Sequence, residues 1–116
     1  DTTESRGLGD VYKRQTKSTA ATITEKAIDV EKVMVDDGYV GAGYGQPTQG
    51  TLDAINLIAR REGVLLDPVY SGKGLAGMIG LIGQKFFDTQ KDVIFLHTGG
   101  AAALFAYGNH FSVAAE

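Results

Sequence analysis

The hexapeptide Asp10-Val11-Tyr12-Lys13-Arg14-Gln15 limits how much of this chain can take part in a fold. Its back-translation, GAT-GTG-TAT-AAG-AGA-CAG, resembles the transposon end that is used to cut DNA for sequencing libraries. We therefore expect residues 1–15 to be a read-through scar without a fold of their own, and such a segment is left out of fold reasoning. Residues 16–116 would then be the tail of a longer open reading frame.

The composition excludes several classes of protein. A chain of 116 residues allows one small domain. The net charge of -3, with no basic cluster, argues against a nucleic-acid partner. The absence of cysteine excludes disulfides and thiolate metal sites. No run approaches the length of a membrane span and the N-terminus lacks the apolar stretch of a signal peptide, so we expect a cytoplasmic protein without a membrane partner.

Two helices are predicted from apolar residues at helical spacing. Thr48 is a plausible N-cap of the first helix and Gly63 its C-cap, with an apolar side formed by Leu52, Ile55, Ile58 and Ala59. Ser71 can cap the second helix, whose apolar stripe is Leu75, Met78, Ile79, Ile82 and Phe86. Beside that stripe a glycine recurs every three residues, at Gly74, Gly77, Gly80 and Gly83. Each costs about 1 kcal/mol relative to alanine, so we expect another backbone to pack very close to that side.

Short apolar runs between these helices predict buried strands. Val64–Leu66 follows the first helix, and Val93–Leu96 follows the second. Val33–Val35 could be an edge strand, and Ala101–Tyr107 can form a short helix. The order helix, strand, helix, strand, helix predicts an α/β fold with parallel strands.

Polar side chains follow both predicted strands, at the sheet edge where ligands bind in open α/β folds. One turn is Pro68–Lys73 and the other is His97–Gly100. Tyr70, Ser71 and Thr98 could therefore converge on one pocket, and free amides at the helix starts would favour an anion. Each residue also has a plainer interpretation: Tyr70 can be a packing aromatic, Ser71 and Thr98 ordinary caps, and Lys73 a solvated lysine. His97 and His110 lack a second ligand at a metal spacing.

Four segments together resemble one enzyme family: Gly43–Pro47, Gly50–Ile55, Glu62–Lys73 and Phe95–Ala101. They are similar to the C-terminal part of D-cysteine desulfhydrase and, less closely, of 1-aminocyclopropane-1-carboxylate deaminase. The resemblance runs from about Ala27 to Phe111. It implies a pyridoxal 5'-phosphate enzyme of fold type II, so residues 16–116 would form the C-terminal part of a parallel-sheet, helix-flanked domain of the tryptophan-synthase-β type, truncated at its N-terminus.

The resemblance also implies roles for individual residues. Tyr70 matches the active-site tyrosine beside the cofactor ring and the substrate, and Tyr44 matches a second tyrosine that faces the substrate. Thr98 matches a hydroxyl that hydrogen-bonds the pyridine nitrogen. At Ser71 the deaminase has a glutamate, which keeps the ring cationic, whereas a neutral hydroxyl makes the ring a weaker electron sink. The Ser71 and Thr98 pairing is desulfhydrase-like.

The implied reaction is α,β-elimination, in which D-cysteine gives pyruvate, sulfide and ammonia, and elimination of sulfite from L-cysteate is its nearest competitor. The intact parent would be a homodimer. Its Schiff-base lysine and its glycine-rich phosphate loop would lie upstream, and Lys73 matches neither, so we expect the fragment to be inactive. The alternative from another class is a small α/β module that binds an anion without chemistry.

Overall fold

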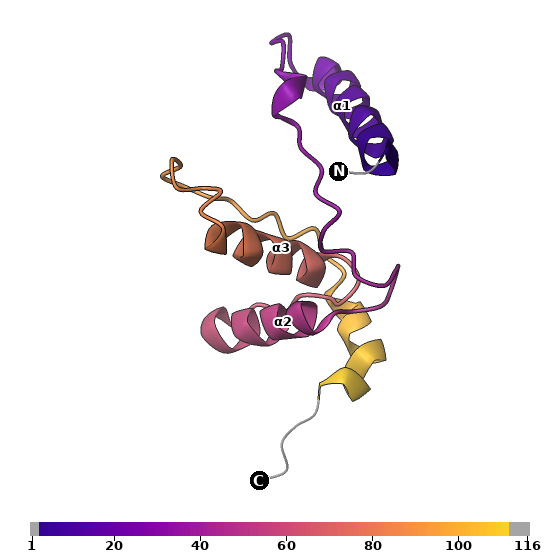
Figure 1. Cartoon of the computed structure of the whole chain (residues 1–116), viewed down its shortest axis with the longest axis vertical. Coiled ribbons are helices and arrows are strands. Elements are labelled where there is room, and N and C mark those ends of the chain that lie inside the picture. The colour runs from indigo at the N-terminus through magenta and orange to yellow at the C-terminus, as the bar shows by residue number, and fades with distance from the viewer. Residues whose placement is uncertain (1–2, 112–116) are drawn as a thin grey trace. The chain divides into compact units, whose positions relative to one another are not determined.

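The computed structural model describes residues 3–111 and divides the chain into two compact units, Asp1–Asp37 and Gly38–Glu116 (Figure 1). Residues 1–2 of the expected read-through segment and residues 112–116 of the expected enzyme fragment lie outside the described residues. In the described part, no helix is both long enough and apolar enough to span a membrane.

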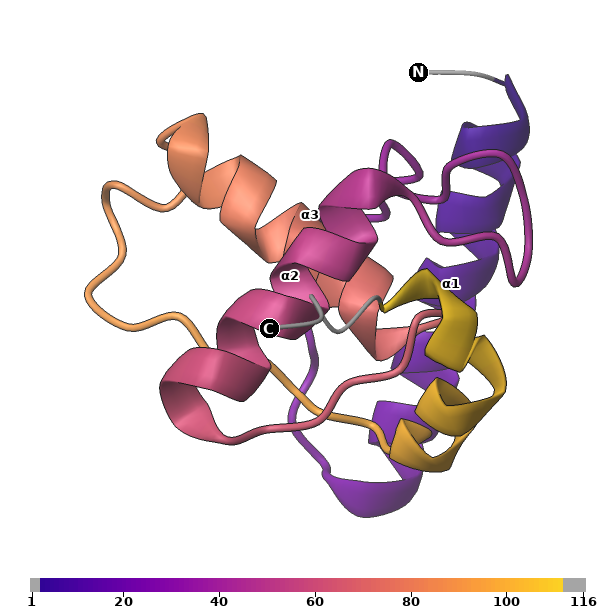
Figure 2. The ribbon, with the colours of Figure 1, turned by 90° about the horizontal axis from the view of Figure 1, so that it is seen from below.

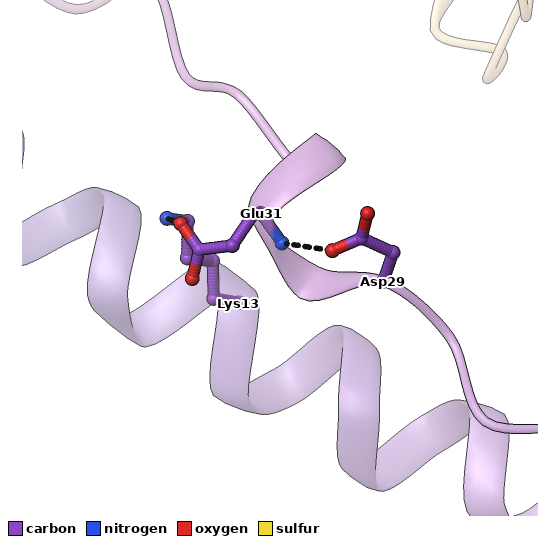
Figure 3. Close-up of polar contacts among 3 residues, drawn as sticks. All are labelled: Lys13, Asp29 and Glu31. Carbon is purple, nitrogen blue, oxygen red and sulfur yellow. Dashed lines mark hydrogen bonds and ion pairs between the residues drawn. The ribbon is translucent and has the colours of Figure 1, made fainter.

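The first unit contains the helix α1, Thr3–Ile23, and a short 3-10 helix η1, Val30–Lys32. The Asp29 carboxylate accepts a hydrogen bond of 3.1 Å from the Glu31 amide and caps η1, and the Lys13 ammonium lies 3.0 Å from the Glu31 carboxylate (Figure 3). The Glu31 side chain is 77% exposed, and exposed pairs of this kind stabilise little. Helix α1 continues through residue 15. Whether residues 1–15 derive from an adapter is a question about the DNA and stays a prediction.

The first predicted helix is confirmed as α2, Gln49–Glu62. Thr48 has extended backbone angles, and its hydroxyl accepts a hydrogen bond of 3.1 Å from the Thr51 amide, as an N-cap does. Gly63 ends the helix in the left-handed conformation at φ 66°, which glycine adopts without steric cost.

The second predicted helix is present as α3, Ser71–Gly83, but its predicted cap is wrong. Ser71 is the first residue inside the helix and Tyr70 is the N-cap residue, whose side chain makes no capping bond. The capping groups come from Asp67 instead, as described below.

The core of the second unit lies between α2 and α3, which lie side by side in both ribbon views (Figures 1 and 2). Its buried apolar residues are Ala54, Ile55, Leu66 and Leu75. Gly72 leaves room for the Ile55 side chain of α2 to pack against the first turn of α3. A Cβ atom at Gly72 would lie 2.7 Å from the Ile55 side chain and 2.6 Å from the Asp67 carbonyl oxygen, so only a residue without Cβ fits there.

The expectation of a second backbone beside the glycine repeat of α3 is wrong. Aromatic side chains fill the space instead. Tyr39 packs across Gly77 and Gly80, and its ring lies 3.3 Å from the position of a Cβ at Gly77. The Phe95 ring lies beside Gly74, 3.5 Å from the equivalent position, whereas a Cβ at Gly83 would meet nothing within 4 Å.

The α/β fold with a parallel sheet is contradicted, because residues 3–111 are helical or irregular and contain no strand. The runs Val64–Leu66 and Val93–Leu96, and also Val33–Val35, have no ladder partner. A strand exists only where a neighbour takes up its backbone donors and acceptors. A hydrogen bond of 2.9 Å connects the Leu65 carbonyl of the first run to Nε2 of His97, the residue that follows Val93–Leu96.

Exposure of the predicted strands also departs from the expectation of burial. Leu66 is 1% exposed, but Ile94 is 89% and Leu96 77% exposed. The final segment forms the 3-10 helix η2, Ala101–His110, with a kink at Tyr107, where a short α-helix was expected over Ala101–Tyr107.

Candidate functional site

Two tyrosines that are distant in sequence meet in the second unit. The hydroxyl oxygens of Tyr44 and Tyr70 are 2.6 Å apart although the residues are 26 positions apart in the chain. Their rings are in edge-to-face contact, with centroids 5.8 Å apart and planes at 68°. Tyr44 is 77% and Tyr70 61% exposed. The pair therefore presents two hydrogen-bonded phenols to the surroundings, and we refer to it below as the tyrosine pair.

Tyr70 is held by a buried carboxylate that sequence reasoning did not single out. Asp67 is 1% exposed. Its Oδ2 atom accepts hydrogen bonds from the amides of Val69 at 2.8 Å and Tyr70 at 2.7 Å. Its Oδ1 atom accepts from the Ser71 amide at 2.9 Å and from the Ser71 hydroxyl. The carboxylate thereby fixes the backbone on both sides of Tyr70. An aspartate shortly before a helix start is a recognisable capping signal that could have identified it.

These contacts set the ionisation of both residues. Burial opposes charge on Asp67, but the hydrogen bonds from the Ser71 side chain and from the amides of Ser71, Tyr70 and Val69 outweigh it and lower its pKa. The pKa of Tyr70 is raised, first by the hydrogen bond with Tyr44, then by burial, and then by the charges of Tyr44 and Asp67. At neutral pH, Asp67 is therefore anionic and the Tyr70 phenol carries its proton.

The loop that carries Tyr44 is held by side chains from distant parts of the unit. The Lys73 ammonium donates hydrogen bonds to the carbonyl oxygens of Val40 at 2.6 Å and Gly43 at 3.0 Å. The Tyr107 hydroxyl donates to the Gly45 carbonyl at 2.7 Å. Lys73 is 9% exposed, so its interpretation as a solvated lysine is wrong. Neither Lys73 nor Tyr107 has a local sequence signal for this role, because the acceptors lie far away in the chain.

The two hydroxyls predicted to face a cofactor ring have different surroundings. Ser71 is buried, and its Oγ both donates to Asp67 Oδ1 and accepts a hydrogen bond of 2.9 Å from the Asp67 amide. It has no proton left for another acceptor. Thr98 is exposed and makes no hydrogen bond in the described part of the chain, so its hydroxyl stays available. The structure therefore brings Tyr44 and Tyr70 together, and within residues 3–111 no hydrogen bond joins Thr98 to Tyr70 or Ser71.

Four amides at the start of α3 are already bonded within the protein, so they are not offered to an external anion as the sequence had suggested. The Asp67 carboxylate takes the amides of Val69, Tyr70 and Ser71, and the Asp67 carbonyl accepts from the Gly72 amide at 2.7 Å. The positive end of the helix dipole is thus already matched by a negative side chain of the protein.

A metal site is not evident in the described residues, which contain no group of three or more histidine, cysteine, aspartate or glutamate side chains suited to an ion. An open surface pocket of about 360 Å³ lies in the first unit and is lined by Lys17, Ala20, Ala21 and residues 24–28. None of its lining residues was expected to take part in a site. No family model matches the chain, so its resemblance to an enzyme family depends on the sequence motifs.

Proposed function

We propose that this chain is the C-terminal part of a pyridoxal-phosphate-dependent carbon–sulfur lyase that converts D-cysteine to pyruvate, sulfide and ammonia by α,β-elimination. The observation that supports it most is the tyrosine pair. The resemblance assigns Tyr44 and Tyr70 independently to the substrate side of the site, and their hydroxyls lie 2.6 Å apart. Two arbitrary surface tyrosines 26 residues apart would have no reason to meet in this way.

The residues that the resemblance assigns to the cofactor fit it in part. The cofactor would supply the electron sink for elimination. Thr98, whose exposed hydroxyl has no partner in the described region, would donate to the pyridine nitrogen. Ser71 does not fit this role, because its hydroxyl is buried and committed to Asp67. Of the two hydroxyl groups that the resemblance assigns to the pyridine ring, only that of Thr98 fits this role.

The tyrosine pair would handle a proton at the substrate. A tyrosine already carries its proton at neutral pH, and the raised pKa of Tyr70 favours this form further, so its Oη atom is a donor and not a base. The departing sulfur of D-cysteine needs a proton as the carbon–sulfur bond breaks, and Tyr70 Oη would donate it. Tyr44 would hold the Tyr70 hydroxyl in place and share the proton along their hydrogen bond.

The competing functions differ in how well these contacts support them. Elimination of sulfite from L-cysteate would use the same groups, whereas ring opening of 1-aminocyclopropane-1-carboxylate needs a stronger electron sink than a neutral hydroxyl provides. A small anion-binding module is less well supported at the start of α3, because Asp67 occupies the amides of Val69, Tyr70 and Ser71 there.

The test begins with the DNA upstream in an uncut genomic copy. A continuous frame that encodes a lysine for the Schiff base and a glycine-rich phosphate loop supports the proposal, and a start codon near Lys17 without such sequence contradicts it. The purified parent, expected to be a cytoplasmic homodimer, is then assayed for pyruvate from D-cysteine and L-cysteate and for 2-oxobutanoate from 1-aminocyclopropane-1-carboxylate. D-Cysteine should be the best substrate, and no pyruvate from any sulfur substrate would refute the assignment.

Substitution in the parent tests the tyrosine directly. We expect Tyr70→Phe to lower turnover by roughly 10²-fold or more, the usual contribution of a positioned proton donor, while the absorbance of bound cofactor is retained. Tyr39→Phe is the matched control, because Tyr39 packs on α3 and lies outside the pair. Unchanged turnover in Tyr70→Phe would show that this tyrosine only packs.

A further inference from the structure

The loop from Val40 to Gly45 has little of its own to fix Tyr44. Gly41 and Gly45 both have left-handed backbone angles, at φ 75° and 71°, and Gly43 lies between them. A hydrogen bond of 3.2 Å from the Gln46 amide to the Gly43 carbonyl closes one turn. Glycine loses more conformational freedom on ordering than any other residue, so a defined position for Tyr44 requires contacts from outside the loop.

Those contacts act on the two residues that flank Tyr44. The Gly43 carbonyl accepts a hydrogen bond from Lys73, and the Gly45 carbonyl accepts one from Tyr107. Lys73 also reaches the Val40 carbonyl and therefore spans the first half of the loop. The backbone is thus held immediately before and immediately after Tyr44.

Lys73 belongs to the same helical turn that carries Tyr70. The Gly74 amide donates to the Tyr70 carbonyl at 3.0 Å, so Tyr70 and Lys73 share the first turn of α3, where the Asp67 carboxylate fixes the Tyr70 amide. The hydrogen bonds of Lys73 therefore hold the loop that carries Tyr44 at a fixed place relative to Tyr70. This arrangement is what a short contact between two hydroxyl groups requires.

A buried lysine whose partners are carbonyl groups is a costly way to hold a loop. Within the described residues no carboxylate pairs with Lys73, and two carbonyl oxygens accept from its ammonium group. Burying a charge is unfavourable unless hydrogen bonds compensate it. An apolar side chain could pack there without the cost of burying a charge, but it could not donate hydrogen bonds to the carbonyl groups of Val40 and Gly43.

We propose that Lys73 is a positioning residue, which together with the Tyr107 hydroxyl clamps the Tyr44 loop and holds the tyrosine pair at hydrogen-bond distance. The role of Lys73 in catalysis rests on the proposed function, whereas the hydrogen bonds by which Lys73 and Tyr107 hold the loop do not. In the intact enzyme, Lys73 would thus set the proton donor of the elimination without touching the substrate.

The test measures the tyrosine pair in the 116-residue chain, without cofactor. Tyrosine labelled with ¹³C at Cζ is titrated by NMR, and Tyr44→Phe and Tyr70→Phe assign the two signals. In the unaltered chain Tyr70 should titrate above the ordinary tyrosine pKa of about 10. Lys73→Met and Tyr107→Phe should each move that midpoint towards the midpoint in Tyr44→Phe, where the hydrogen bond is gone. Lys91→Met, at an exposed lysine, should leave it unchanged.

Circular dichroism establishes which variants are folded. A lysine that only stabilises the fold would lower the melting temperature of Lys73→Met and leave the Tyr70 midpoint where it was, and that result overturns the proposal. If Lys73→Met fails to fold, Tyr107→Phe, which removes a single oxygen atom, decides the question in the same way. Because the titration needs neither substrate nor cofactor, failure of the clamp is distinguishable from failure of the enzyme assignment.

Discussion

Replacement of Asp67 by asparagine is the sharpest test of how the start of α3 is built. Each carboxylate oxygen accepts two hydrogen bonds: Oδ2 from the amides of Val69 and Tyr70, and Oδ1 from the amide and the hydroxyl of Ser71. Asparagine has a single side-chain oxygen. Whichever way its amide is turned, an NH₂ group would face two donors, and two of the four bonds would be lost.

The expected loss of stability follows from these contacts. A hydrogen bond to a charged group contributes about 1.5–3 kcal/mol, and a donor left unpaired in a buried place adds its desolvation penalty. Small shifts of the turn would recover part of this loss. We therefore expect Asp67→Asn to lower the free energy of unfolding by about 3 kcal/mol, a large part of the stability of a small domain.

The loss of stability caused by Asp67→Asn should be larger at neutral pH than at acidic pH. Burial of Asp67 alone would raise its pKa, but the hydrogen bonds from Ser71, Tyr70 and Val69 lower it below its unfolded value of about 3.9. A lowered folded pKa contributes stability that is present above the unfolded value and is lost as the pH falls through the folded one. A protonated aspartic acid resembles asparagine, so the difference between the two proteins should narrow below about pH 4.

Urea unfolding followed by circular dichroism at pH 7 and at pH 3 measures both effects. Asp53→Asn is the matched control, because Asp53 is exposed and accepts a side-chain bond of 2.8 Å from Gln49. Its effect should stay within about 0.5 kcal/mol. Equal midpoints for the two variants at pH 7, or a difference from the unaltered protein that is the same at both pH values, would refute this account of Asp67.

The glycines of α3 should respond to alanine according to what lies above each of them. Gly72→Ala should destabilise by about 1–3 kcal/mol, since its Cβ would press on the Asp67 carbonyl and on Ile55. Gly80→Ala must displace the Tyr39 ring, so urea midpoints should fall despite the better helix propensity of alanine. Gly83→Ala, with open space around it, should gain up to about 1 kcal/mol, and a loss there would show that the end of α3 packs against something.

The helices were predictable because their signals are local. Thr48 and Gly63 bound α2 through contacts within four residues, and the sequence specifies both. The start of α3 is also specified by nearby residues, but two of them, Asp67 and Ser71, could each cap the helix. Asp67 has two oxygens and can accept four bonds, whereas the Ser71 hydroxyl lies inside the first turn and binds Asp67 itself. The order of side chains in the turn, rather than their presence, decides which one caps.

The predicted sheet failed for a physical reason that the sequence of one run cannot reveal. An apolar run becomes a strand only when another chain segment pairs with it, and parallel pairing depends on distant segments. The Leu65 carbonyl of the first run is hydrogen-bonded to His97, the residue after the second run, and no backbone ladder is present between the two runs. Ile94 and Leu96 are strongly exposed, and neither run forms a strand within the described residues.

The two members of the tyrosine pair are positioned by contacts of different range in the sequence. Tyr70 is fixed by Asp67, three residues away, so its backbone position follows from the turn Asp67–Ser71 alone. Tyr44 depends on Lys73, which lies 30 residues from Gly43, and on Tyr107, which lies 62 residues from Gly45. Contacts that close long stretches of chain are lost first when packing loosens, because the freed loop gains the most entropy. The Tyr44 loop should therefore detach before α3 unfolds, and the hydrogen bond of the pair should disappear in mild denaturant while the helical signal persists.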